Sequence, residues 1–170
     1  MPSPASPRPL PGSLARVVLV VRALCLLGFA TLLAVPFWFW LSPENVLALG
    51  PQMAGLAGGI VVDDRARALG AAVSLLPIGI GLYALWQLWR LFAEYGAGRV
   101  FGRAALARLK RFAWALLAAA LLAPLVRAVM SVVLTLANPP GRRQLVIGLS
   151  WDDYLAVLLA LVLIAIATVM

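Results

Sequence analysis

Residues that could perform chemistry are few in this chain, and their spacing matches no catalytic pattern. There is no histidine, and the single cysteine, Cys25, lies inside an apolar run. The six acids lie outside the apolar runs, at Glu44, Asp63, Asp64, Glu94, Asp152 and Asp153. A metal site would therefore need clustered carboxylates, and acid–base catalysis would need two groups able to share a proton. Glycine loops for phosphate and nucleophile elbows are also missing from the sequence. We expect a protein that is not an enzyme, with no catalytic residue, no metal ligand and no cofactor.

Arg127 and Pro77 are the two intramembrane positions at which a polar function is expected. A charge inside an apolar run is costly and marks a functional residue by default. Pro77 lacks an N–H, so it leaves the carbonyl of Val73 without its helical donor. One hypothesis is that Arg127 caps this carbonyl while Asp152 or Asp153 draws the guanidinium outward. The alternative is that Arg127 faces a wet outer cavity and only holds helices together.

A basic stretch lies between the second and third apolar runs. On a helical wheel its apolar residues share one face and several cations share the other, which is typical of a helix lying in the membrane interface. Anionic lipid attracts each such cation by about 1 kcal/mol. The stretch either anchors the topology or serves as a docking surface for a cytoplasmic partner. Its candidate contacts with headgroups or a partner are Arg99, Arg103, Arg108, Lys110 and Arg111.

The composition is that of a membrane protein. Hydrophobic residues make up 64% of the 170 residues and charged residues 12%, whereas soluble domains have about 45–50% and about 25%. A single domain of this length cannot bury such a surplus, so the surplus must face lipid. The net charge of +8 is carried between apolar runs, which favours lipid headgroups over direct contact with nucleic acid.

Four apolar runs predict an all-α integral membrane four-helix bundle over residues 17–170. Crossing a hydrocarbon core of about 30 Å takes about 20 helical residues, and lipid offers the backbone no hydrogen-bond partner. All six tryptophans fall at the ends of the runs, as expected for residues at headgroup level. The predicted spans are 17–41, 68–93, 112–137 and 154–170. The proline-rich residues 1–16 are expected to form a disordered tail.

The distribution of Lys and Arg predicts the direction of the spans. Nine of these cations lie at the N-terminal side or between spans two and three, and four lie in the other two connections, together with five of the six acids. The positive-inside rule then places both termini and the basic connection in the cytoplasm, in a multi-pass protein of the bacterial inner membrane.

The external connection at residues 42–67 is expected to be a loop. The glycines between Gly55 and Gly59 suggest a turn or a re-entrant patch within it. The pair Asp63 and Asp64 could bind a cation, but a paired acid before a helix is more often a cap.

Spans two and three carry a family resemblance. The sequence reads Leu-Pro-Ile at 76–78, Leu-Tyr-Ala-Leu-Trp at 82–86 and Arg-Leu-Phe-Ala-Glu-Tyr at 90–95. This resembles the YoaS-like family of bacterial four-span membrane proteins of unknown function. The motif positions that match are Leu91, Phe92, Tyr95, Gly98 and Phe101, with Leu109 further on.

Two departures accompany the resemblance. Ala104 and Ala105 stand where members often have a polar residue, and the chain stops at Met170 where members usually continue into a charged tail. The resemblance implies the fold and the membrane class. Some members are similar to products encoded beside small helix-turn-helix regulators, which suggests a membrane partner that holds or releases a transcription factor.

Two functions are expected from these features. The first is a non-enzymatic inner-membrane protein that acts by interaction, as a sensor or regulator of a cytoplasmic partner. The alternative is a small transporter or channel subunit that forms an oligomer around a polar path including Arg127. Because the spans contain no acid or histidine, proton-coupled transport is disfavoured.

Overall fold

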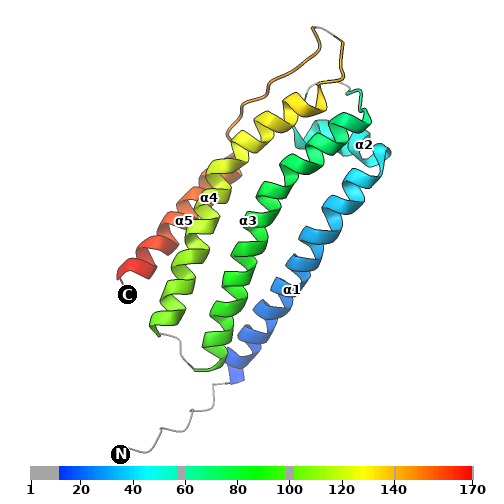
Figure 1. Cartoon of the computed structure of the whole chain (residues 1–170). Coiled ribbons are helices and arrows are strands. Elements are labelled where there is room, and N and C mark those ends of the chain that lie inside the picture. Colours follow the sequence, from blue (N-terminus) through cyan, green and yellow to red (C-terminus); the bar gives the residue numbers. More distant parts are fainter. Residues whose placement is uncertain (1–11, 57–59, 99–101, 140, 170) are drawn as a thin grey trace, which may run out of the picture.

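The chain folds into five helices, as seen in a computed structural model that describes residues 12–56, 60–98, 102–139 and 141–169. The helices are α1 (Gly12–Leu41), α2 (Pro43–Met53), α3 (Asp64–Gly96), α4 (Arg103–Leu134) and α5 (Trp151–Val169), and these described ranges contain no strand. The long helices α1, α3, α4 and α5 run side by side, and α2 lies across one end (Figure 1). Each long helix is long and apolar enough to cross a membrane.

The short helix α2 corrects the prediction of a plain loop at residues 42–67. Ser42 has the extended backbone of an N-cap, Pro43 takes the first helical position, and Glu44 lies in the first turn. All three residues favour a helix start, and the prediction gave this signal too little weight. After α2 the chain turns at Gly55, whose φ of 66° is left-handed. Residues 57–59, where more of this turn was predicted, lie outside the described residues.

The helix boundaries extend or shorten the predicted spans. Helix α1 begins at Gly12, within the segment predicted as a tail, while residues 1–11 lie outside the described part. Helix α3 has 33 residues and α4 has 32, which gives each a length of about 50 Å. Both are therefore longer than a hydrocarbon core of about 30 Å.

The basic stretch belongs to α4 itself. Helix α4 starts at Arg103 after the extended N-cap Gly102, and no glycine or proline interrupts it before Pro124. The stretch therefore forms the first turns of a helix that continues into the third apolar run. Its contact with the membrane interface stays a prediction.

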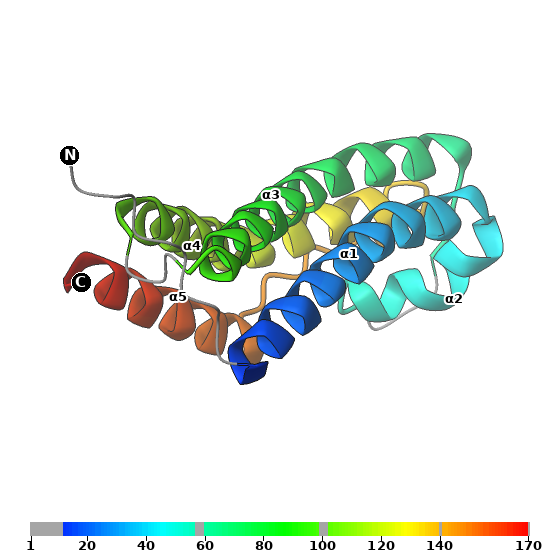
Figure 2. The same ribbon diagram turned by 90° about the horizontal axis from the view of Figure 1, so that it is seen from below.

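The four long helices of the predicted bundle are arranged as an open row. Helix α3 packs against both α1 and α4, α4 packs against α5, and α2 bridges α1 and α4. Figure 2 shows this order from one end. Among the described residues, α1 has no comparable contact with α4 or α5. In lipid no hydrophobic force closes a bundle, so helices associate only where their surfaces fit.

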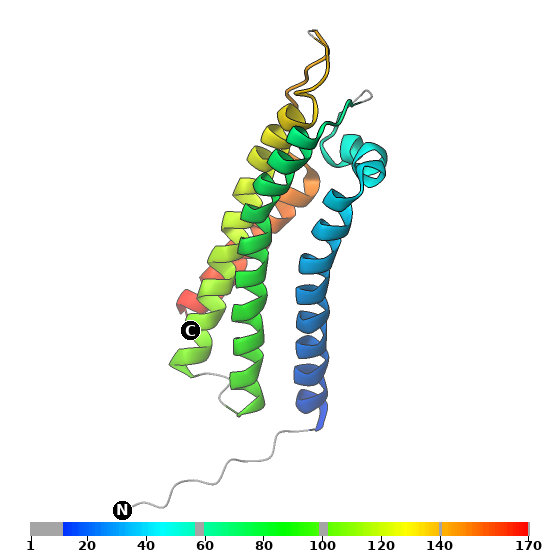
Figure 3. The ribbon, with the colours of Figure 1, turned by 45° about the vertical axis from the view of Figure 1, so that its right-hand side comes forward.

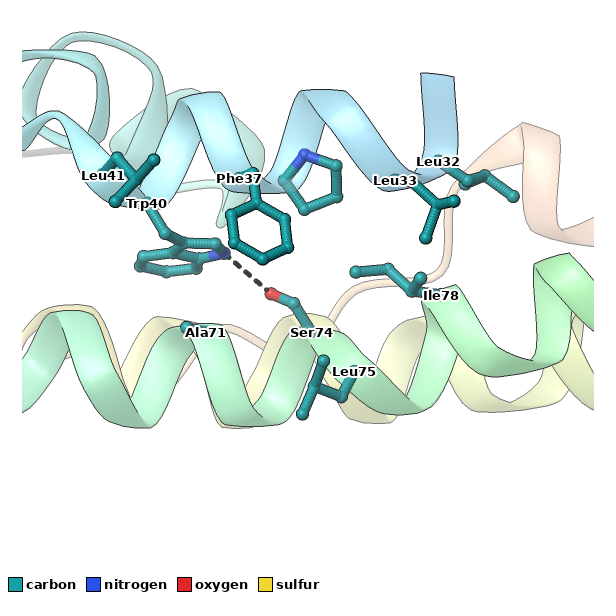
Figure 4. A pocket seen from close by; sticks show the side chains of 10 residues that line it. Leu32, Leu33, Phe37, Trp40, Leu41, Ala71, Ser74, Leu75 and Ile78 are labelled. Atoms are coloured by element: carbon teal, nitrogen blue, oxygen red, sulfur yellow. Dashed lines mark hydrogen bonds between the residues drawn. The ribbon is translucent and has the colours of Figure 1, made fainter. Parts of the chain in front are cut away.

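The fit between α1 and α3 depends on glycine. A Cβ on Gly70 would lie 2.1 Å from the ring of Trp40, and a Cβ on Gly28 would lie 3.0 Å from Leu85. The Trp40 indole N–H donates to the Ser74 hydroxyl at 3.2 Å, beside a cavity of about 310 Å³ between the two helices (Figure 4). The missing side chain at Gly70 thus lets the indole lie directly on the backbone of α3.

The C-terminal end of α1 is capped by side chains from α2 and α3. The guanidinium of Arg67 donates to the carbonyls of Trp40 at 3.1 Å and Leu41 at 3.0 Å, and the Asn45 amide donates to the carbonyl of Trp38 at 3.0 Å. The last carbonyls of a helix have no intrahelical donor. These contacts satisfy them where α1 turns sharply into α2.

A small apolar core lies under α2. It consists of Phe39 from α1, Val46 from α2, Leu134 from α4, and Ala54 and Ile60 from the connection after α2. Residues 39–54 and Ile60 thus meet the sequence-distant end of α4 at one end of the row.

We predict that Gly70→Ala destabilises the protein and that Gly79→Ala does not. The added methyl at Gly70 has to displace Trp40, whereas nothing lies within 4 Å of a Cβ at Gly79. Overpacking of this kind costs about 1–3 kcal/mol. Thermal unfolding of the purified protein in detergent, followed by circular dichroism, measures the difference. Equal melting temperatures for the two variants would contradict the close packing of α1 on α3.

Candidate functional site

Most of the buried polar side chains in the described residues lie at the α2 end of the molecule. They are Ser131, Thr135, Asn138 and Asp153, while Gln87 lies elsewhere on α3. Ser131 and Thr135 follow Arg127 at intervals of four residues, and Asn138 comes three residues later. This spacing places all four on one face of α4 and its extension. We call Arg127, Ser131, Thr135 and Asn138 the polar stripe.

The polar stripe binds the backbone that returns from α4 to α5. This return segment, residues 141–150, has no regular secondary structure beyond a turn at its start. The Ser131 hydroxyl accepts from the Val146 N–H at 3.0 Å, and the Thr135 hydroxyl accepts from the Gln144 N–H at 3.2 Å. Further along, Arg127 donates to the Gly148 carbonyl at 3.2 Å, and Asn138 donates to the Arg142 carbonyl at 3.3 Å.

The hydrogen bonds between the polar stripe and the return segment repeat regularly because the helix and the extended chain have matching rises. Four residues of helix rise about 6 Å, and two residues of extended chain rise about 6.6 Å. Each step along the polar stripe therefore meets every second residue of the return segment. The side chains between these contacts are exposed, with Leu145 at 62%, Ile147 at 75% and Leu149 at 84%. Backbone groups outside a helix need other hydrogen-bond partners, and the stripe supplies them.

Asp153 joins the return segment to α5. Its carboxylate accepts from the Ser150 N–H at 2.8 Å, and the Ser150 hydroxyl accepts from the Asp153 N–H at 3.3 Å. This reciprocal pair is a capping box at the start of α5. The same carboxylate forms a salt bridge with Arg127. The guanidinium is thereby tied to the helix start and, through Gly148, to the segment before it.

The structure supports half of the Arg127 hypothesis. Of the two acids considered, Asp153 pairs with Arg127, while the side chain of Asp152 is exposed. Arg127 and Pro77 line one cavity of about 210 Å³ between α3 and α4. The hydrogen bonds of the guanidinium nevertheless go to Asp153 and Gly148, so the proposed cap on Val73 is wrong. A carboxylate is a stronger partner for a guanidinium than a carbonyl is.

The predicted cap at the start of α3 is confirmed. The Asp63 carboxylate accepts from the Ala66 N–H at 2.7 Å, and Asp64 pairs with Arg67 at 3.2 Å. Both acids thus have protein partners. No group of three metal-ligating side chains occurs within the described residues.

The cations of the basic stretch lie at the opposite end of α4. Arg103, Lys110 and Arg111 are exposed, and Arg108 is half-buried with its Nε enclosed and unpartnered. Arg99 lies outside the described residues. In Figure 3 this end of α4 is far from α2 and close to the end of α3. The basic side chains and the polar stripe therefore occupy opposite ends of one helix.

The family-motif residues mark the end of α3. Leu91 is buried, Phe92 and Tyr95 pack edge to face with ring centroids 5.3 Å apart, and Gly98 has a φ of 76°. The left-handed glycine follows the last turn of the helix, as expected of a residue that ends it. Phe101 lies outside the described residues.

The sequence interpretation missed Ser131, Thr135 and Asn138. Their spacing from Arg127 was a usable signal, because polar residues at helical intervals inside an apolar run rarely face lipid. What they bind could not be predicted, because the return segment contacts them through its backbone, which carries no residue-specific pattern.

We predict that Arg127 and Asp153 are energetically coupled. Arg127→Leu and Asp153→Asn each break the tie between α4 and α5, so the double variant should lose less stability than the sum of the single variants. Removing one member of a buried pair costs about 3–5 kcal/mol, and we expect about 1–3 kcal/mol because a third of the Arg127 side chain is exposed. Unfolding in detergent measures this coupling, with the exposed Asp152→Asn as the control. Strict additivity would contradict it.

Comparisons with known proteins place the chain in a family. The family model described as protein of unknown function (DUF2975) matches residues 62–170. The match covers α3, α4 and α5, and with them the polar stripe, the return segment and the basic stretch. Curated proteins gave no match, and solved structures gave none. The chain is a membrane protein with four apolar helices that belongs to the DUF2975 family of proteins of unknown function.

Proposed function

We propose that this chain is a multi-pass protein of the bacterial inner membrane that acts without catalysis, as a sensor or regulator of a cytoplasmic partner. The observation that carries the proposal is the continuity of α4. One helix of 32 residues has the polar stripe at one end and exposed cations at the other. A change at the polar stripe is thereby linked through the helix to the end of α4 that carries Arg103, Lys110 and Arg111, which we call the basic end.

The polar stripe is suited to holding α4 in one position. Hydrogen bonds from Ser131 and Thr135 and the ion pair of Arg127 fix the return segment against this end of the helix. A ligand or a force that released the segment would free α4 to shift or rotate. Helix shifts of about 1–2 Å are a common means of transmitting a signal.

The basic end is suited to contact with an acidic partner. Its cations project beyond the apolar span, where a protein surface can reach Arg103, Lys110 and Arg111. Charge complementarity of this kind steers association and gives specificity. The YoaS-like resemblance suggests a helix-turn-helix regulator as the partner class. The proposed partner is a cytoplasmic protein with an acidic surface beside these residues.

The proposal requires the basic end to face the cytoplasm. The nine-to-four distribution of Lys and Arg supports this direction. We predict that a cysteine at Ala104 reacts with an impermeant maleimide only after cells are permeabilised, and that a cysteine at Arg143 reacts in intact cells. Both residues are exposed, and the native thiol, Cys25, is buried and is replaced by alanine for the test. The reverse labelling pattern would refute the direction and the partner proposal together.

We predict that neutralising the basic end abolishes capture of a cytoplasmic partner. Arg103, Lys110 and Arg111 are changed together to glutamine, and the tagged protein is crosslinked in cells and purified. Loss of three cations should weaken binding to an acidic surface by more than about tenfold. The matched control is the triple glutamine variant of Arg65, Arg142 and Arg143, which are exposed at the other end. Equal capture by both variants would contradict the proposal.

The alternative is a transporter or channel subunit. It is favoured by the cavity of about 210 Å³ that Arg127 and Pro77 line within the membrane span. Ion or solute flux through proteoliposomes containing the purified chain, abolished by Arg127→Leu, would support transport and argue against a purely regulatory role.

A further inference from the structure

Arg22 is a second arginine inside an apolar run, and its guanidinium stacks on an aromatic ring. It lies in α1, inside the first apolar run, and its guanidinium stacks over the Trp89 ring of α3 at 4.2 Å from the centroid. Stacking on tryptophan stabilises a guanidinium and fixes its plane. The donors of a stacked guanidinium point outward from its edges, where an anion can accept from two of them at once.

Arg22 has no counter-charge among the described residues. Its Nε is enclosed without a hydrogen-bond partner, and the whole residue is only half-buried. Its hydrogen-bonding and charge requirements are therefore unmet by the protein, in contrast to Arg127. Glu94, the acid nearest to Trp89 along α3, has an interaction of its own. A long cationic side chain near the end of a span normally reaches the interface, where lipid headgroups supply anionic partners.

The depth of Arg22 matches the level of lipid phosphates. Trp40, near the other end of α1, is 18 residues away, which corresponds to about 27 Å along the helix. If Trp40 lies at one headgroup level, Arg22 lies at the opposite edge of a hydrocarbon core of about 30 Å. Trp89 lies at the same level, as expected for an interfacial tryptophan.

We infer that Arg22 and Trp89 form a binding site for the phosphate of an anionic lipid, in the leaflet at the end of the row away from α2. The ring holds the guanidinium, and the exposed part of the arginine side chain binds the headgroup phosphate. Acyl chains then lie along the apolar surface of α1 on the Trp40 side of Arg22, where Leu26 is 56% exposed and Leu27 is 64% exposed. A soluble phosphate would have to reach the edge of the hydrocarbon region, which favours the lipid as its source. The inference needs the helices to cross the bilayer, but it needs neither their direction nor the regulatory role proposed above.

The test is native mass spectrometry of the full chain, released from detergent micelles that are titrated with phosphatidylglycerol. We expect the wild type to retain phosphatidylglycerol in preference to phosphatidylcholine. Arg22→Gln should weaken this retention about tenfold, because a charge-assisted pair of hydrogen bonds is lost. The Trp89→Leu variant keeps the charge of Arg22 but loses the stacked ring. Its retention of phosphatidylglycerol should therefore fall between that of the wild type and that of Arg22→Gln. Circular dichroism confirms that each variant keeps the helix content of the wild type.

The matched control is Arg90→Gln. Arg90 also lies over a tryptophan, Trp86, at 5.6 Å from the centroid, but both residues are exposed. This variant should retain lipid as the wild type does. Equal retention by Arg22→Gln and the wild type, or an equal loss in Arg90→Gln, would overturn the site. Displacement of the lipid by inorganic phosphate would show a free-anion site and would overturn the assignment to lipid.

Discussion

The constraint that governs this structure is that every backbone polar group shielded from water needs a hydrogen-bond partner within the protein. Lipid supplies no hydrogen bonds, and each unsatisfied group costs several kcal/mol. Helices meet the constraint by themselves along most of the chain. The informative places are those where they cannot, namely the end of α1 and the return segment before α5. At both places side chains from another helix complete the hydrogen bonding.

The return segment shows how sequence and geometry cooperate to meet this constraint. Helical steps of four residues from Arg127 to Thr135 match extended steps of two residues from Gly148 to Gln144. The polar stripe therefore serves the segment as a neighbouring strand would. Asp153 then begins α5 and pairs with Arg127, so one carboxylate caps a helix and neutralises an intramembrane charge.

The open row has consequences for how this protein could work. Helix α1 is held mainly by α3, through close contacts at Gly70 and Gly28, and the small core under α2 ties it to α4. Large apolar surfaces of α1 and α5 remain exposed, as is typical of helices that face lipid. Hydrogen bonds and the ion pair between helices are concentrated at the α2 end, whereas exposed cations lie at the other end. The proposed regulatory role of α4 rests on this division.

The sequence by itself determined the class of the fold and several helix boundaries. The length of the apolar runs required four long helices, and the acid pair Asp63 and Asp64 marked the start of α3. These are local properties, written in neighbouring residues. Tertiary structure alone decided the open row, the choice of Asp153 over Asp152, and the course of the return segment along α4. Those features depend on backbone groups and helix surfaces that meet across long sequence separations, where residue type alone does not specify the partner.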